Sequence, residues 1–174
     1  MLYNVASAVL TLLLLLAACA DVRSRRIPNA LTITGLAAAL ALRLVAGPGA
    51  AVEGLLGALL AFILVLPFFV LGVFGGGDAK LLIAIGAFMG PRELLGALLV
   101  IASVGGIIGV IDAGRKGVLL PVLYNCGEIL KHWGTFGRRG ASRSLATVGA
   151  LAIPYGVPIA TGALLWWFLE VRSL

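Results

Sequence analysis

Long apolar runs separated by short polar segments make up most of the chain. Most of these runs approach the ~20 residues that a helix needs to cross the ~30 Å hydrocarbon core of a bilayer. The fourth run is shorter and extends only about 20 Å at 1.5 Å per residue, so we expect a sunken helix end or a locally thinned bilayer. The predicted spans cover residues 2–20, 30–46, 54–74, 78–90, 94–111 and 145–170.

The pattern therefore predicts an all-α polytopic membrane protein, a bundle of six transmembrane helices formed by a single membrane-embedded domain over residues 1–174. Between the fifth and sixth spans, residues 112–144 alternate apolar and polar side chains, which indicates a cytoplasmic helix lying in the membrane interface. Two short segments are expected to join helices. Gly47-Pro48-Gly49 forms a turn, and Pro28 opens the second span at its first position.

Composition excludes an ordinary soluble protein. Hydrophobic residues make up 61% of the 174 residues and charged residues only 11%, against roughly 25% charged residues in a typical soluble domain, and the mean hydropathy is +1.15. In a membrane protein the positions of the basic residues matter more than their sum. The net charge of +6 is therefore taken to favour a lipid bilayer, and not nucleic acid, as partner. Cys19 and Cys126 have no metal-ligand spacing, and we expect neither a metal nor another cofactor.

The basic residues predict how the chain is oriented. If residues 21–29, 75–80 and 112–144 share one side, that side carries ten of the 13 Lys and Arg residues, which favours the cytoplasmic side of the membrane and places both termini outside. The ten are Arg23, Arg25, Arg26, Lys80, Arg115, Lys116, Lys131, Arg138, Arg139 and Arg143. Asp21, at the end of the first span, and Asp78, at the start of the fourth, then lie at the same membrane face and at similar depth.

The segment Gly75-Gly76-Gly77-Asp78 allows two interpretations. In the first it is only a turn, with glycine supplying a positive φ and Asp78 capping the next helix. In the second, Asp78 is a functional group, because an ionisable side chain at the membrane boundary is costly and marks a candidate site. A second acid at the same membrane face favours the functional interpretation.

Asp21 and Asp78 form a pair suited to hydrolysis. One carboxylate, ionised, acts as general base on a water, while the other, protonated, donates its proton to the scissile amide. Carboxylates about 3 Å apart share one proton because both cannot ionise. Asp112 is the rival for this role, since it is also cytoplasmic, but Arg115 and Lys116 nearby indicate a boundary residue. The remaining acids fall on the outer side or in the interfacial segment: Glu53, Glu93, Glu170 and Glu128.

These residues resemble a known family in three places. Gly75-Gly76-Gly77-Asp78 is similar to the GxGD signature of intramembrane aspartyl proteases, and Asp78-Ala79-Lys80 extends it in the form seen in type IV prepilin peptidases. Asp21, followed by Ile27-Pro28-Asn29, resembles that family's first catalytic aspartate and its Leu/Ile-Pro turn. Ile153-Pro154-Tyr155-Gly156 resembles a motif in the family's last helix.

The resemblance implies an aspartic endopeptidase that removes the short basic leader from type IV prepilins at the cytoplasmic membrane face. The implied substrate carries this leader followed by an apolar helix. The chain lacks the length and the cysteine pairs of the zinc-binding cytosolic domain found in larger members. It therefore resembles the short form associated with Flp pili and tight-adherence secretion, for which methyltransferase activity is not expected. The oligomeric state stays open.

The predicted site has two catalytic residues, Asp21 and Asp78. The residues expected to support them or to position the substrate are Gly75, Gly77, Lys80, Pro28, Pro154, Tyr155 and Gly156. Two roles stay open for Lys80. It positions Asp78 or the substrate, or it is a positive-inside lysine that snorkels to the interface.

Two other functions compete with this one. A signal-peptide-peptidase-like or presenilin-like protease shares GxGD but predicts Pro-Ala-Leu in a late helix, where this chain has Pro154-Tyr155-Gly156. A small proton- or ion-coupled transporter predicts acids near mid-span and two related halves. The acids of this chain lie near span ends or in loops, and its sequence shows no convincing internal repeat.

Overall fold

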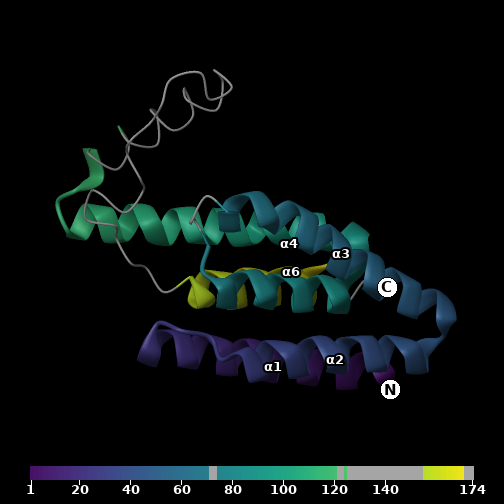
Figure 1. Ribbon diagram of the computed structural model, residues 1–174. Coiled ribbons are helices and arrows are strands. Elements are labelled where there is room, and N and C mark those ends of the chain that lie inside the picture. The colour runs from purple at the N-terminus through teal and green to yellow at the C-terminus, as the bar shows by residue number, and fades with distance from the viewer. Residues whose placement is uncertain (71–73, 121–123, 125–154, 171–174) are drawn as a thin grey trace. The chain divides into compact units, whose positions relative to one another are not determined.

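The computed structural model describes residues 1–70, 74–120, 124 and 155–170 (Figure 1). The secondary structure of the described residues is entirely α-helical. The described helices are α1 (Leu2–Ser24), α2 (Asn29–Ala46), α3 (Pro48–Val70), α4 (Gly76–Arg115) and α6 (Gly156–Leu169). The chain divides into two compact units, Met1–Gly105 with Pro154–Leu174 and Gly106–Ile153, and α4 contributes residues to both.

Four of the described helices, α1 to α4, are long and apolar enough to cross a membrane, and α6 is a shorter apolar helix. The described part of the chain is therefore all-helical, as predicted, and its long apolar helices are those expected of a membrane protein. The count of six spans stays a prediction, because residues 121–123 and 125–154 lie outside the described residues. The interfacial helix expected within 112–144 falls mostly in that part of the chain. The single domain over residues 1–174 likewise stays a prediction.

The helix boundaries around two prolines differ from those predicted. Only Gly47, with φ 134° and ψ 164°, separates α2 from α3, and α3 begins at Pro48 instead of Gly54. Proline suits the first helical position because an N–H there would have no intrahelical acceptor, so the expected three-residue turn is wrong. Pro28 lies just outside α2, as its extended N-cap with φ −61° and ψ 135°, instead of opening the helix.

The predicted fourth and fifth spans are joined in α4, in which Gly90 is the one residue with non-helical dihedral angles. Its φ of 81° and ψ of 173° lie in a region that glycine adopts most readily. Pro91 then starts the second segment, so no separate turn follows. The first segment, from Gly76 to Met89, extends about 20 Å at 1.5 Å per residue, which agrees with the short fourth span predicted.

Arg43 of α2 reaches the break in α4. Its Nη2 donates a hydrogen bond of 2.8 Å to the carbonyl oxygen of Phe88, and its Nη1 lies 3.4 Å from Oε2 of Glu53 in α3. Carbonyl groups just before a helix break lose their helical N–H donors, and the guanidinium replaces one of them. Arg43 therefore ties α2 and α3 to the point where α4 changes direction.

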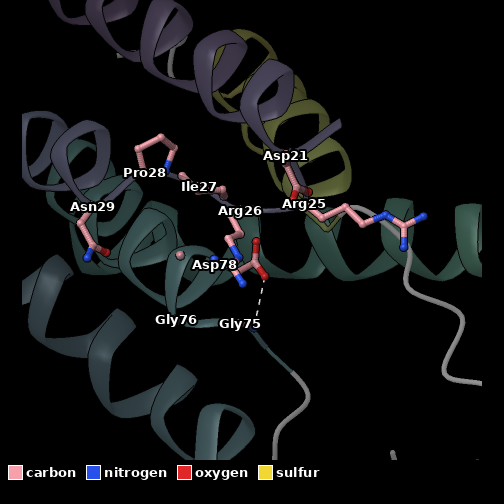
Figure 2. A pocket seen from close by; sticks show the side chains of 10 residues that line it. Asp21, Arg25, Arg26, Ile27, Pro28, Asn29, Gly75, Gly76 and Asp78 are labelled. Carbon is pink, nitrogen blue, oxygen red and sulfur yellow. Dashed lines mark hydrogen bonds between the residues drawn. The ribbon is translucent and has the colours of Figure 1, made fainter. Parts of the chain in front are cut away.

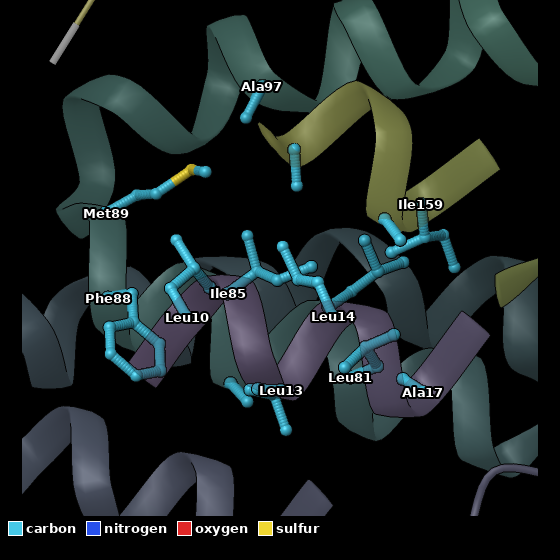
Figure 3. Packing of buried hydrophobic residues seen from close by; sticks show 14 of the residues in the cluster. Leu10, Leu13, Leu14, Ala17, Leu81, Ile85, Phe88, Met89, Ala97 and Ile159 are labelled. Carbon is cyan, nitrogen blue, oxygen red and sulfur yellow. The ribbon is translucent and has the colours of Figure 1, made fainter. Parts of the chain in front are cut away.

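One face of α1 builds the core of the first unit. Leu14 and Ala17 are fully buried, and Asp21 continues the same face because it follows Ala17 by one helical turn. Buried side chains of α4 and α6 belong to the same cluster (Figure 3), among them Leu81, Ile85 and Ile159. Asp21 is directed inward, since the packing that buries Leu14 and Ala17 also buries this acid.

α3 and α4 cross where both helices have glycine. A Cβ atom on Gly57 would meet the carbonyl oxygen of Gly86 and would lie 2.7 Å from the Cα of Gly90. A Cβ atom on Gly86 would lie 2.9 Å from the Cβ of Ala61. The close approach matters in lipid, because packing and not the removal of apolar surface from water holds membrane helices together.

Gly57→Ala should therefore lower the thermal stability of the detergent-solubilised protein. Overpacking costs about 1–3 kcal/mol, which exceeds the roughly 0.5–1 kcal/mol that alanine gains over glycine inside a helix. Gly49→Ala is the matched control in α3, because no atom lies within 4 Å of its added Cβ. Equal midpoint temperatures for the two variants in thermal unfolding would contradict the close crossing.

Candidate active site

The ends of α1, α2 and α4 border a pocket of ≈ 390 Å³ in the first unit (Figure 2). Both predicted catalytic residues line it, together with the loop between α1 and α2 and the glycines before Asp78. The lining residues are Asp21, Arg25, Arg26, Ile27, Pro28, Asn29, Gly75, Gly76, Gly77 and Asp78. The fold thus brings together two acids that are far apart in the sequence.

Asp21 is buried near the C-terminal end of α1, with 6% of its surface exposed. Its Oδ2 accepts a hydrogen bond of 2.7 Å from the backbone N–H of Gly156, the first residue of α6. The first N–H groups of a helix have no intrahelical acceptor and carry partial positive charge. The N-terminus of α6 thus compensates a carboxylate that is almost entirely buried.

The space beside Gly156 has no room for a side chain. A Cβ atom there would lie 2.8 Å from Asp21 Cβ and 2.9 Å from Asp21 Oδ2, so the carboxylate would have to move. The sequence identified Gly156 as a supporting residue only by resemblance, and the structure gives it a physical role.

The two residues before Gly156 were also predicted to support the site. The ring of Tyr155 meets the ring of Phe74 edge-on with centroids 5.8 Å apart. Pro154 lies outside the described residues.

Asp78 is the third residue of α4 and is half-buried. Its Oδ2 accepts a hydrogen bond of 3.2 Å from the backbone N–H of Gly75, which precedes the helix (Figure 2). An acid in the third position that binds the N–H of the capping residue forms one half of a capping box. Asp78 therefore caps its own helix and also lines the same pocket as Asp21.

The glycines before Asp78 permit close packing. The expectation that they supply a positive φ is wrong, because none of Gly75–Gly77 has one. A Cβ atom on Gly77 would instead lie 3.0 Å from the Cβ of Ile27 and 3.2 Å from its carbonyl oxygen. The missing side chain of Gly77 lets the start of α4 pack against the loop that follows α1.

Arg25 turns the chain at the end of α1. Its φ of 51° and ψ of 32° place it in the left-handed region, and its N–H donates a hydrogen bond of 2.7 Å to the carbonyl oxygen of Asp21. Residues other than glycine adopt this conformation rarely. Sequence reasoning treated Arg25 and Arg26 as positive-inside charges and missed that they line the pocket. Their position directly after the turn of helix that carries Asp21 was the available signal.

Lys80 contacts the second helix. Its Nζ donates a hydrogen bond of 2.8 Å to Oδ1 of Asn29, the first residue of α2. This contact joins the start of α4 to the start of α2, and both roles predicted for Lys80 stay open. The other predicted supporting residues, Pro28, Gly75 and Gly77, line the pocket itself.

The rival acid Asp112 and the outer-side acid Glu93 each have a partner of their own. Asp112 forms an ion pair of 2.7 Å with Lys116 inside the second unit. Glu93 accepts a hydrogen bond of 3.1 Å from Nε1 of Trp166. Among the described residues, no group of three or more His, Cys, Asp or Glu side chains is placed to hold a metal ion. Glu128 lies outside the described residues.

Two carboxylates on one pocket can activate a water. An ionised carboxylate removes a proton from the water, and a protonated one donates a proton to a leaving group. The volume of ≈ 390 Å³ accommodates several waters, each of which occupies about 30 Å³ in the liquid. The wall at Gly75 and Gly76 also exposes backbone, which suits contact with an extended peptide. The arrangement is suited to hydrolysis by acid and base.

Comparison with known proteins points to one family. A family model described as the type IV leader peptidase family matches residues 8–110. The matched region covers more than half of the chain and contains Asp21, the glycine-rich segment and Asp78. The chain matches no curated protein and no solved structure.

Gly156→Ala is expected to displace the Asp21 carboxylate and to lower the midpoint temperature of thermal unfolding in detergent. An overpacking cost of about 1–3 kcal/mol corresponds to a decrease of several degrees, at about 2–4 °C per kcal/mol for a chain of this size. The control is Gly105→Ala, whose Cβ would make an ordinary contact, 3.6 Å from the Cβ of Pro158. If both variants unfold at the wild-type temperature, the contact of α6 with Asp21 is not as tight as described.

Proposed function

The chain belongs to the type IV leader peptidase family, and from this premise we propose that it is an integral-membrane aspartic endopeptidase for prepilins. The proposed reaction removes the short basic leader from Flp-like type IV prepilins at the cytoplasmic face of the inner membrane. One observation carries the proposal. Asp21 and Asp78, from two different helices, line the same pocket.

In the proposed mechanism the two carboxylates share one proton. The ionised one takes a proton from a water that attacks the scissile carbonyl carbon, and the protonated one donates its proton to the leaving amide nitrogen. Sharing one proton avoids placing two negative charges in the same pocket. In Asp21 and in Asp78, Oδ2 accepts a backbone hydrogen bond. Each Oδ1 accepts none from the described residues and is available to water and substrate.

The proposed substrate suits the position of the pocket. A prepilin with a basic leader and an apolar helix would enter as a membrane span, with its cleavage point at the boundary where α1 ends and α4 begins. Gly75 and Gly76 line the pocket and are exposed, so an extended peptide backbone can approach closely. The excess of Lys and Arg on the loops that carry both acids supports action at the cytoplasmic face.

Co-expression with a Flp-type prepilin tests the proposal, with leader removal followed by gel mobility. Asp21→Asn and Asp78→Asn are each expected to slow processing at least about 100-fold, the lower end of what a general acid or base contributes. Asparagine keeps an oxygen that can accept the N–H of Gly156 or of Gly75. These variants therefore remove the acid chemistry while they preserve the contacts that hold the fold.

Asp112→Asn is the matched control and is expected to process the prepilin at close to the wild-type rate. Its ion pair with Lys116 lies in the second unit and is no part of the proposed chemistry. Continued processing by Asp21→Asn or Asp78→Asn would refute the two-aspartate mechanism. Loss of processing in Asp112→Asn, together with activity in one of the other two, would identify Asp112 as the true partner.

A further inference from the structure

Two chain segments border the pocket, residues 21–29 between α1 and α2 and residues 75–80 at the start of α4. Among the described residues, a single hydrogen bond joins these segments, from Lys80 Nζ to Asn29 Oδ1 at 2.8 Å. Beside it, Gly77 packs against Ile27. One polar contact and one close apolar contact therefore join the two segments at the edge of the pocket.

Helix geometry places Lys80 on a different face of α4 from the Asp78 carboxylate. Gly77 and Lys80 lie three residues apart and share one face of α4, the face that meets Ile27 and Asn29. Asp78 lies two residues before Lys80, which is about 200° around the helix at 3.6 residues per turn. Lys80 therefore contacts Asn29 and the loop after α1 from a different face of α4 than the one that carries Asp78.

We propose that Lys80 and Asn29 form a clamp that sets the separation of the Asp21 and Asp78 carboxylates, which makes both of them positioning residues. The proposal rests on the proposed peptidase function. Asp21 belongs to one segment and Asp78 to the other. The backbone hydrogen bonds that each acid accepts come from α6 and from the turn before α4, so neither bond links the two segments. The clamp supplies this link.

The chemistry of the contact fits this role. A hydrogen bond from an ammonium group to an amide oxygen is charge-assisted and stronger than a neutral one. Lys80 makes no ion pair with any acid among the described residues, so Asn29 is its partner. Both side chains are exposed, so removing them leaves the core packing intact. Because proton transfer depends steeply on the separation of the reacting groups, loss of the clamp affects turnover more than substrate binding.

Kinetics of leader cleavage test the clamp. Lys80→Met and Asn29→Leu are each expected to lower kcat by about 10- to 100-fold with KM nearly unchanged. The double variant is expected to be no slower than the slower single variant, because both changes remove the same contact. Lys80→Arg retains a donor for Asn29 and should recover most of the rate. Lys116→Met, which removes a lysine paired with Asp112 in the second unit, is the matched control and should keep wild-type kinetics.

A labelling experiment tests the clamp without any activity. In a background with Cys19→Ser and Cys126→Ser, Ile27→Cys places a thiol at a position that is only 7% exposed, and slow reaction with a maleimide is expected. Adding Lys80→Met should raise the labelling rate several-fold, because the loop after α1 is then released from α4. Adding Lys80→Arg should leave the rate close to that of the background.

Three results would each overturn the clamp. They are additive effects in the double variant, a change confined to KM, and a decrease in kcat without faster labelling of the Ile27→Cys thiol. Failure of the proposed function gives a different result, because the wild-type chain would then not cleave the prepilin at all. The labelling rates would still report in that case whether Lys80 and Asn29 hold the loop.

Discussion

A carboxylate buried in an apolar helix bundle must find a hydrogen-bond donor, and this requirement organises the protein. Asp21 lies on the same face of α1 as Leu14 and Ala17, so packing that face into the core carries the acid inward. The N-terminus of α6 supplies the donor through Gly156, which lies 135 positions further along the chain. Because an unpaired buried charge is strongly destabilising, this contact determines where α6 begins relative to α1.

The second acid reaches the pocket by a different route. Asp78 is held by the turn before its own helix, and α4 approaches the loop after α1 because Gly77 has no side chain. A distant helix therefore holds one carboxylate and a local turn holds the other. Membership of the leader peptidase family indicates the chemistry that such a pair serves. The contacts between α4 and the loop after α1 explain how the chain brings the pair together.

The acid pair could be predicted from the sequence because both members lie at span ends on one predicted membrane face and in motifs similar to those of the family. The physical roles of their neighbours could not. A run of glycines in the sequence is compatible with a positive φ and with close packing of the backbone against a neighbour. The contact of Gly77 with Ile27 shows that close packing applies here. The left-handed turn at Arg25 and the bond from Lys80 to Asn29 depend on tertiary contacts, which periodicity along one helix does not encode.

The dependence of Asp21 on α6 also has a consequence in time. Chains are synthesised from the N-terminus at about 5–20 residues per second, so α1 is complete well before residue 156 has been made. Until then Asp21 lacks its donor from α6, although both aspartates are present once residue 78 has been made. A nascent chain therefore does not yet carry the assembled site, and the order of synthesis delays its completion until α6 docks beside α1.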